Sequence, residues 1–215
     1  MRIVIQCAAR KNPGGSFVVN GRTVLFVARP DLAPPSDGCA YARPDDLSDG
    51  QGTWRQRLLQ YNRDGNKNPL GLLPAYRLYK HTAYRELVER FGLEKVFILS
   101  AGWGLIPAGF MTPPYDISFS AQAQDWMRRR KGDGYDDFRL IPDDGGEVVF
   151  LGGKDYLPLF CELVSPLKGR KRVIFNSARA PQTPAEFVAV RFPTTTRTNW
   201  HYEAARSLIA GELGG

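Results

Sequence analysis

Four short apolar runs constrain the fold of this chain more than any other feature. They occupy residues 3–5, 96–99, 148–151 and 173–175, and each continues into a segment rich in Gly, Ser, Asn or Ala. Runs that are apolar on both faces are typical of strands in a parallel sheet that helices cover on both sides. The pattern therefore predicts a mostly parallel central sheet.

The segments between these runs have helical patterns. In residues 74–91 apolar side chains recur at spacings of three and four, and Gly92 follows as a stop signal. Residues 157–164 and 200–209 have similar patterns. Strands that alternate with helices predict an α/β fold, with the sheet flanked by helices.

Two stretches interrupt this alternation. An Asn-Gly pair at 20–21 lies between two apolar runs and predicts a β-hairpin, and the Pro- and Asp-rich residues 29–53 predict a long irregular loop. A second irregular stretch is expected at 101–118. With no internal repeat or linker, we predict one α/β domain over 1–215, with the hairpin and loop inserted at about 16–53.

The composition of the chain indicates which partners, cofactors and location to expect. The formal net charge of +7 suits a polyanionic partner, although unpaired surface cations would give the same sum. Three scattered cysteines do not form a disulfide framework, and His81 and His201 lack metal-site spacing, so we expect neither a metal nor another cofactor. No long apolar segment is present, which predicts a cytoplasmic protein without a membrane partner.

Ligands of open α/β sheets bind beyond the carboxyl ends of the strands, so the segments that follow the four runs are the candidate site. The first contains Cys7, Arg10 and Lys11, followed by two glycines, and it suits a phosphate. The alternative is a surface turn with solvated charges, in which Cys7 is a small buried residue rather than a nucleophile.

The second segment contains Ser100, the sequence Gly-Trp-Gly around Trp103, and Pro-Pro-Tyr-Asp ending in Tyr115 and Asp116. Glycines on both sides of a tryptophan suit an aromatic platform on which a base stacks. The rigid Pro-Pro-Tyr element would hold the Asp116 carboxylate in place, unless Asp116 only caps a turn.

The third segment carries Gly152-Gly153 before Lys154 and Tyr156, at a junction between a strand and a helix. Its amides and ammonium suit a phosphate or a carboxylate, although it lacks the spacing of a known phosphate loop. The fourth begins with Asn176, which would contact a ligand or cap a turn.

Two further clusters suggest nucleic acid binding. Arg128, Arg129, Arg130 and Lys131 follow Trp126 at an expected helix end, where they would contact phosphates or remain solvated. Near the C-terminus, Asn199 and His201 belong to a segment of hydrogen-bonding and aromatic residues at a helix start. Asn199 is alternatively the N-cap of that helix, with Trp200 in the core.

Three ordered motifs resemble those of the YaaA-like superfamily. They are Cys7 with Lys11, the run Leu-Ser-Ala-x-x-Gly-Leu at 99–105 leading to Pro-Tyr-Asp at 114–116, and Gly-Lys-x-Tyr at 153–156. Together they cover about a quarter of the chain, and Trp103 departs from the smaller or tyrosine-type residue expected there. The resemblance implies an α/β fold with a basic cleft and association with DNA. It points distantly to the uracil-DNA glycosylase architecture and to phage-defence glycosylases that remove modified bases.

Residues and resemblance together predict a DNA base N-glycosylase that flips a modified base out of the helix. Asp116 would stabilise the sugar cation or orient water, while Asn176, Asn199 or His201 would bond the base edge. Trp103 would stack on the base. Lys11, Lys154 and the 128–131 cluster would hold phosphates.

Two other functions fit the same residues. One is a DNA-binding stress or defence protein without turnover, which needs the basic groove but no positioned carboxylate. The other is an enzyme that acts on free nucleosides or nucleotides, as a hydrolase or a base-exchange transferase.

Overall fold

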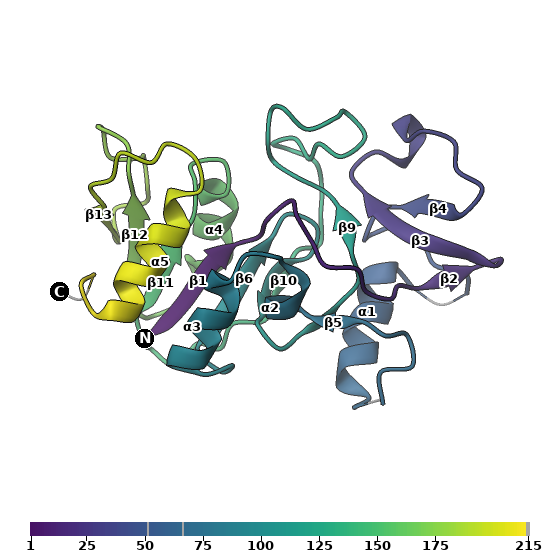
Figure 1. Ribbon diagram of the computed structural model, residues 1–215, viewed down its shortest axis with the longest axis horizontal. Coiled ribbons are helices and arrows are strands. Elements are labelled where there is room, and N and C mark those ends of the chain that lie inside the picture. The colour runs from purple at the N-terminus through teal and green to yellow at the C-terminus, as the bar shows by residue number, and fades with distance from the viewer. Residues whose placement is uncertain (51, 66, 214–215) are drawn as a thin grey trace.

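A seven-stranded sheet forms the centre of the computed structural model, which describes residues 1–50, 52–65 and 67–213. Seen from one edge to the other, the strands are β10 (Phe138–Arg139), β7 (Gly104–Pro107), β6 (Val96–Ser100), β1 (Arg2–Gln6), β11 (Val148–Leu151), β12 (Lys171–Phe175) and β13 (Phe187–Arg191). All neighbours are parallel except β6 and β7, so β7 and β10 run against the other five. The expected mostly parallel sheet is confirmed, and the four apolar runs lie in β1, β6, β11 and β12 (Figure 1).

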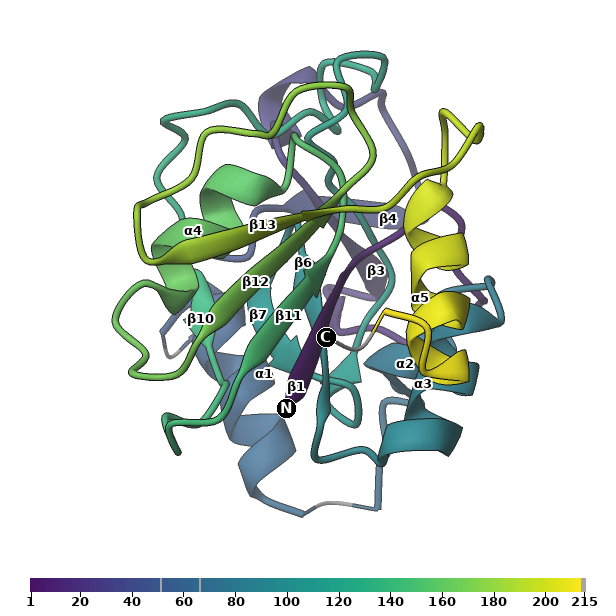
Figure 2. The ribbon, with the colours of Figure 1, turned by 90° about the vertical axis from the view of Figure 1, so that its left-hand side faces the viewer.

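Helices cover both faces of this sheet. Helix α3 (Ala83–Phe91) packs with α5 (Trp200–Ala210) on one face, and α4 (Leu157–Val164) lies on the other (Figure 2). The side chains of β1 alternate accordingly, because Ile3 and Ile5 join the core under α3 and α5 while Val4 joins the core under α4. This two-sided burial explains why the strands are apolar throughout.

A smaller sheet extends from one side of the molecule. It consists of β2 (Val18–Val19), β3 (Arg22–Val27) and β4 (Cys39–Ala42), with β9 (Tyr115–Asp116) paired to β3 (Figure 1). The predicted hairpin joins β2 to β3, and both turn residues have positive φ, 49° at Asn20 and 75° at Gly21. Asn-Gly is the pair that such a turn favours.

Both segments expected to be irregular contain regular structure. Residues 29–53 hold the short helix η1 (Pro30–Leu32) and β4, and residues 101–118 hold β7, β8 (Met111–Thr112) and β9. Helix α1 (Trp54–Arg63), which Thr53 and Gln56 cap reciprocally, was not expected from the sequence. This helix buries only Trp54, Arg55 and Leu58, so its apolar periodicity is weak.

The helix expected over 74–91 is divided. Strand β5 (Leu73–Pro74) pairs with β8 and leads into α2 (Ala75–Leu78), and α3 begins only at Ala83. Between the two helices, the backbone around Tyr79 bonds to the segment that follows β1: Asn12 N–H donates to the carbonyl of Leu78 at 2.7 Å. Tertiary pairing thus interrupts a continuous helical pattern. Gly92 ends α3 with a φ of 88°, as predicted.

The basic run at 128–131 is not part of a helix, contrary to expectation. Residues 121–127 consist mostly of turns, and Ser118 pairs with Arg128 in an isolated bridge. No helix in the described part of the chain combines the length and the apolar character needed to cross a bilayer.

Candidate functional site

A cavity of about 620 Å³ opens beyond the carboxyl ends of β1, β11 and β12, with the first turn of α5 on one side. Six of the residues predicted for the site line it: Cys7, Lys154, Tyr156, Asn176, Asn199 and His201. They come from four segments far apart in sequence. The parallel sheet brings them together, as expected for the crevice beyond its strands.

Amide side chains fix one wall of this cavity. The Gln6 side-chain oxygen accepts a hydrogen bond from the backbone N–H of Gly153 at 2.6 Å, which ties the end of β1 to the turn after β11. That N–H is therefore already bonded within the protein. The Gly-Gly-Lys turn has one backbone donor fewer for a ligand than the sequence suggested. Asn176 Nδ2 donates to the carbonyl of Thr196 at 3.3 Å, and Lys154 is exposed at the rim.

A buried histidine forms part of the opposite wall. His201, in the first turn of α5, is 3% exposed, and its Nε2 has no hydrogen-bond partner among the described residues. Burial, with a smaller contribution from the charge of His81, lowers the pKa of His201 to about 4. The imidazole is therefore neutral at physiological pH. Asn199 precedes it with a left-handed φ of 63°, is exposed, and makes no capping hydrogen bond through its side chain.

Hydroxyl groups are packed beneath the cavity around Cys7. The Cys7 Sγ lies 3.2 Å from the Tyr156 hydroxyl, and the Tyr115 hydroxyl lies 2.8 Å from those of both Tyr79 and Ser100. Burial raises the pKa of all three tyrosines well above the usual range, so these phenols stay protonated. Cys7 is 4% exposed, in line with the alternative of a small buried residue.

Ser100 and Tyr115 lie under the cavity wall rather than on it. The Ser100 Oγ accepts hydrogen bonds from the backbone N–H groups of Gly102 and Trp103, at 3.2 and 3.1 Å, and both Ser100 and Tyr115 are fully buried. Their side chains hold the turn that follows β6, and neither reaches a ligand in the cavity.

Lys11 and Asp116 lie together beside the cavity. The Nζ of Lys11 lies 4.2 Å from the centre of the Tyr115 ring, and Asp116 is the next residue along β9. Both are half-buried, and their charges interact without a direct ion pair. Asp116, expected to act on the sugar of a bound nucleotide, is outside the cavity lining, whereas Ser118 is part of it.

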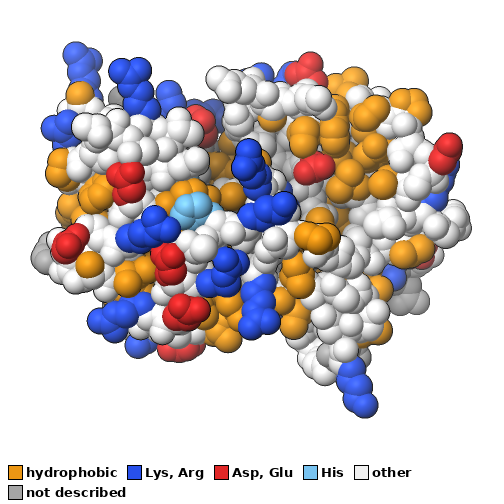
Figure 3. Space-filling view, viewed as in Figure 1, with side chains coloured by type: hydrophobic (Ala, Val, Ile, Leu, Met, Phe, Trp, Pro, Cys, Tyr) orange, Lys and Arg blue, Asp and Glu red, His pale blue; other side chains and the backbone are white. Residues whose placement is uncertain are grey.

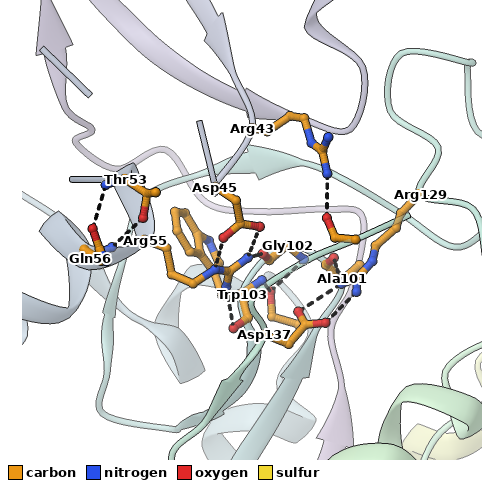
Figure 4. Close-up of polar contacts among 12 residues, drawn as sticks. Arg43, Asp45, Thr53, Arg55, Gln56, Ala101, Gly102, Trp103, Arg129 and Asp137 are labelled. Carbon is orange, nitrogen blue, oxygen red and sulfur yellow. Dashed lines mark hydrogen bonds and ion pairs between the residues drawn. The ribbon is translucent and has the colours of Figure 1, made fainter. Parts of the chain in front are cut away.

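Trp103 does not form a stacking platform. It is fully buried, its ring lies 4.9 Å from that of Phe26 in an edge-on arrangement, and the Arg55 guanidinium lies 5.6 Å from it (Figure 4). Gly104, with a φ of 85°, begins β7 so closely against β10 that a Cβ would lie 2.6 Å from the backbone N of Phe138. The Gly-Trp-Gly element therefore serves the core.

The cluster at 128–131 is also only partly available to a ligand. Arg129 is 7% exposed, pairs with Asp137, and donates to the carbonyl of Ala101 at 2.9 Å (Figure 4). Arg130 is exposed and faces Asp125 at 3.8 Å, Arg128 is half-buried, and Lys131 is exposed. The expectation that Arg129 binds DNA is wrong, because its charge is neutralised inside the protein.

A different group of cations lies near the cavity. Arg10, Arg77 and Lys80 are exposed and form no ion pair with any described residue. The backbone pairing of residues 10–12 with 78–80 brings them together. Figure 3 shows Lys and Arg side chains gathered in the middle of this face, over α2 and the segment that follows β1. We call Arg10, Arg77 and Lys80 the basic strip.

Sequence reasoning missed several residues of the site. Gln6 was detectable as the polar residue that directly follows the apolar run at 3–5, whereas nothing in the local sequence marked Tyr79, Arg77 or Lys80. In the part of the chain that the structure describes, no group of three or more His, Cys, Asp and Glu side chains is placed to hold a metal ion. Comparison of the chain with protein-family models, curated proteins and solved structures yielded no match.

Proposed function

We propose that this protein is a DNA base N-glycosylase that accepts a flipped, modified base in the cavity beside β1, β11 and β12. The observation that carries the proposal is a cavity with uncharged hydrogen-bonding side chains in its walls, those of Gln6, Asn176 and His201, and with an amine and a carboxylate, Lys11 and Asp116, beside it. The cavity of about 620 Å³ is larger than one unmodified base ring fills, so it has room for a substituent.

The cavity groups suit recognition of an uncharged base. His201 is neutral, and the Asn176 and Gln6 amides each keep hydrogen-bonding capacity beyond the one contact that fixes them. Such groups read the edge of a flipped base and stabilise the negative charge that develops on it as it leaves. The buried Trp103 plays no part, and the cavity aromatics Tyr156 and Trp200 remain to contact a base.

Asp116 suits the sugar side of the reaction. When a base occupies the cavity, its deoxyribose lies at the opening. A half-buried carboxylate there stabilises an oxocarbenium-like sugar or orients the attacking water. Asp116 forms no hydrogen bond or ion pair with a described side chain, which leaves its oxygens for this task.

The basic strip suits the DNA backbone. Arg10, Arg77 and Lys80 are exposed on the two segments whose backbone pairing also holds Lys11, and unpaired exposed cations bind phosphates without reading sequence. Two parts of the quoted motifs, Cys7 and Gly153 to Tyr156, line the cavity, which supports our proposal that the chain is related to the YaaA-like superfamily. Removal of modified bases would place it in defence against phages with modified DNA.

One observation favours a second candidate, a DNA-binding protein without turnover. Asp116 lies outside the cavity lining, and the carboxylate that does line it, Asp155, is exposed. A binding protein needs the basic strip and the cavity but no carboxylate near the sugar.

The test is to incubate the protein with unmodified DNA, single- and double-stranded, and with hypermodified phage DNA, and to assay released bases and abasic sites. We expect release from modified DNA and a loss of about 100- to 1,000-fold in rate for Asp116→Asn at unchanged DNA affinity. Asp37→Asn, an exposed aspartate in the loop before β4, is the matched control. Absence of release from every DNA would favour the binding protein, and release from free nucleosides without DNA binding would favour a nucleoside enzyme.

A further inference from the structure

The segment that follows β1 holds Lys11 in a fixed position. Residue 11 forms an isolated antiparallel bridge with Tyr79, and next to it the Asn12 backbone and side chain both bond to carbonyls of α2, those of Leu78 and Arg77, each at 2.7 Å. A lysine on a surface turn would move freely. Here the backbone is tied to a second segment, so the root of the side chain is fixed.

The ammonium group of Lys11 has few partners. Its Nζ lies over the Tyr115 ring and contacts the carbonyl of Ala9 at a long 3.4 Å, and no described carboxylate forms an ion pair with it. Burial lowers the pKa of Lys11, and this outweighs the opposing charges of Cys7 and Asp116.

The groups that face Lys11 come from three segments. They are Cys7 at the end of β1, Tyr79 between α2 and α3, and Tyr115 with Asp116 on β9. The two tyrosines carry no charge because burial raises their own pKa values. Asp116 supplies the carboxylate of this set. Near neutral pH, more of Lys11 is therefore unprotonated than of a lysine in water. An unprotonated amine is the nucleophilic form.

Lys11 and Asp116 lie next to two segments that line the cavity. Residues 6–9 line the cavity and Lys11 follows two residues later, while Ser118, which also lines it, follows Asp116 by two residues. The Lys11–Asp116 pair thus adjoins the cavity lining on two segments, those that follow β1 and β9. This place suits a group that reacts with deoxyribose better than one that binds a remote phosphate.

We propose that Lys11 is an amine nucleophile that condenses with the aldehyde of an abasic deoxyribose, so that the protein also acts as a DNA lyase. The inference rests on the proposed function for its substrate, because base release creates the abasic site. It goes beyond that function because hydrolysis of the N-glycosidic bond needs no amine.

The reaction is balanced without an external oxidant or reductant. The Lys11 Nζ lone pair forms a bond to C1′ of the ring-opened sugar, and the carbonyl oxygen leaves as water, which with one proton from the solvent gives a protonated imine. Asp116, the neighbouring base, removes a proton from C2′, and the electron pair of that C–H bond forms a C1′–C2′ double bond while the C=N electron pair returns to nitrogen. The nitrogen lone pair then restores the protonated imine: a C2′–C3′ double bond forms as the C3′–O bond breaks, and the 3′ phosphate leaves with the electrons of that bond. Water hydrolyses the imine and restores the Lys11 amine.

The experiment uses DNA with a preformed abasic site, which makes it independent of base recognition. The full-length protein is mixed with this DNA and with sodium borohydride, which reduces the C=N bond of an imine and locks the protein onto the DNA. We expect a covalent adduct that peptide mapping by mass spectrometry places on Lys11. We also expect strand cleavage on the 3′ side of the abasic site when borohydride is omitted.

Lys11→Arg keeps the positive charge but cannot form the imine, so we expect loss of both adduct and cleavage. Lys95→Arg is the matched control, because Lys95 is exposed just before β6, at the amino-terminal end of the parallel strands. Mapping is done on the unaltered protein and does not depend on the folding of a variant. An adduct mapped to another amine, or no adduct at all, overturns the proposal.

Failure of this inference can be told apart from failure of the proposed function. Base release from modified DNA without an adduct on abasic DNA would support the glycosylase proposal and contradict the lyase proposal. An adduct on Lys11 without base release from any DNA would leave the amine chemistry standing and remove the glycosylase.

Discussion

The Arg55 guanidinium donates a hydrogen bond to the carbonyl oxygen of Trp103 over 3.0 Å, which joins helix α1 to the turn after β6. It also donates to the carbonyl of Gly102 at 3.0 Å and pairs with Asp45 (Figure 4). Arg55 is 3% exposed. A single buried cation thus fixes the Gly-Trp-Gly turn, the loop before α1, and α1 itself, and we expect it to matter for stability more than for any ligand.

Replacement of Arg55 by Met should lower the free energy of unfolding by about 3–5 kcal/mol, because it leaves Asp45 and two carbonyls without their buried partner. Urea denaturation followed by circular dichroism measures this change. Arg63→Met, at the exposed end of the same helix, should change it by less than about 0.5 kcal/mol. An equal effect of the two substitutions would contradict a structural role for Arg55.

Trp103 gives a prediction that separates core packing from base stacking. Trp103→Ala should lower the free energy of unfolding by about 3–5 kcal/mol, because it removes a fully buried side chain beside Phe26. Trp103→Phe keeps most of the volume and removes an indole N–H that has no partner among the described residues. DNA affinity of the folded Trp103→Phe protein, measured by fluorescence anisotropy, should equal that of the wild type. A weaker DNA affinity of Trp103→Phe than of the wild type would indicate that Trp103 contacts the DNA after all.

His201 should make the protein less stable in mild acid. Its pKa is lowered from 6.5 to about 4 on folding, so the unfolded chain binds the proton more readily between these values. The contribution is fully present above pH 6.5 and is lost as the pH falls to 4, at a cost of about 3 kcal/mol.

The measurement is the free energy of unfolding of the wild type and of His201→Gln from pH 7 to pH 4. The difference between the two proteins should shift in favour of the variant as the pH falls. His81→Gln is the control, because the pKa of His81 is also lowered chiefly by burial. This variant should retain most of the wild-type decrease in the free energy of unfolding between pH 7 and pH 4. A constant difference between the wild type and His201→Gln would show that His201 is not held neutral.

The basic strip should set the salt dependence of DNA binding. Replacement of Arg10, Arg77 and Lys80 by Gln should weaken binding and reduce the slope of log K against log salt by up to about 0.9 for each phosphate that the protein no longer neutralises. The comparison is the double substitution of Arg130 and Lys131 by Gln, for which we expect a smaller change because Arg130 already faces Asp125. Titrations at several salt concentrations decide between the two surfaces. A larger effect of the Arg130 and Lys131 substitutions would show that DNA binds to the turn at 128–131 instead of to the basic strip.

Short-range apolar patterns in the sequence correctly predicted those strands and helices that have the same kind of surroundings along their whole length. The runs in β1, β6, β11 and β12 are apolar on both faces, and α4 begins and ends at the predicted residues, because each element meets one kind of environment along its length. The helix expected over 74–91 failed at Tyr79, where the backbone bonds to residues 10–12. That pairing joins segments almost seventy residues apart, and no pattern within either segment reveals it.

The chemistry of the site divides in the same way. The sequence alone determined that Cys7, Lys154, Tyr156 and Asn176 would follow strands of one sheet and therefore meet beyond its carboxyl edge. Only the tertiary structure decided which charges are available to a ligand: Arg129 is neutralised by Asp137, while Arg10 remains exposed. The existence of a buried strand follows from a short-range apolar pattern. The state of a charge depends on the solvent and on partners that the folded chain brings from elsewhere in the sequence.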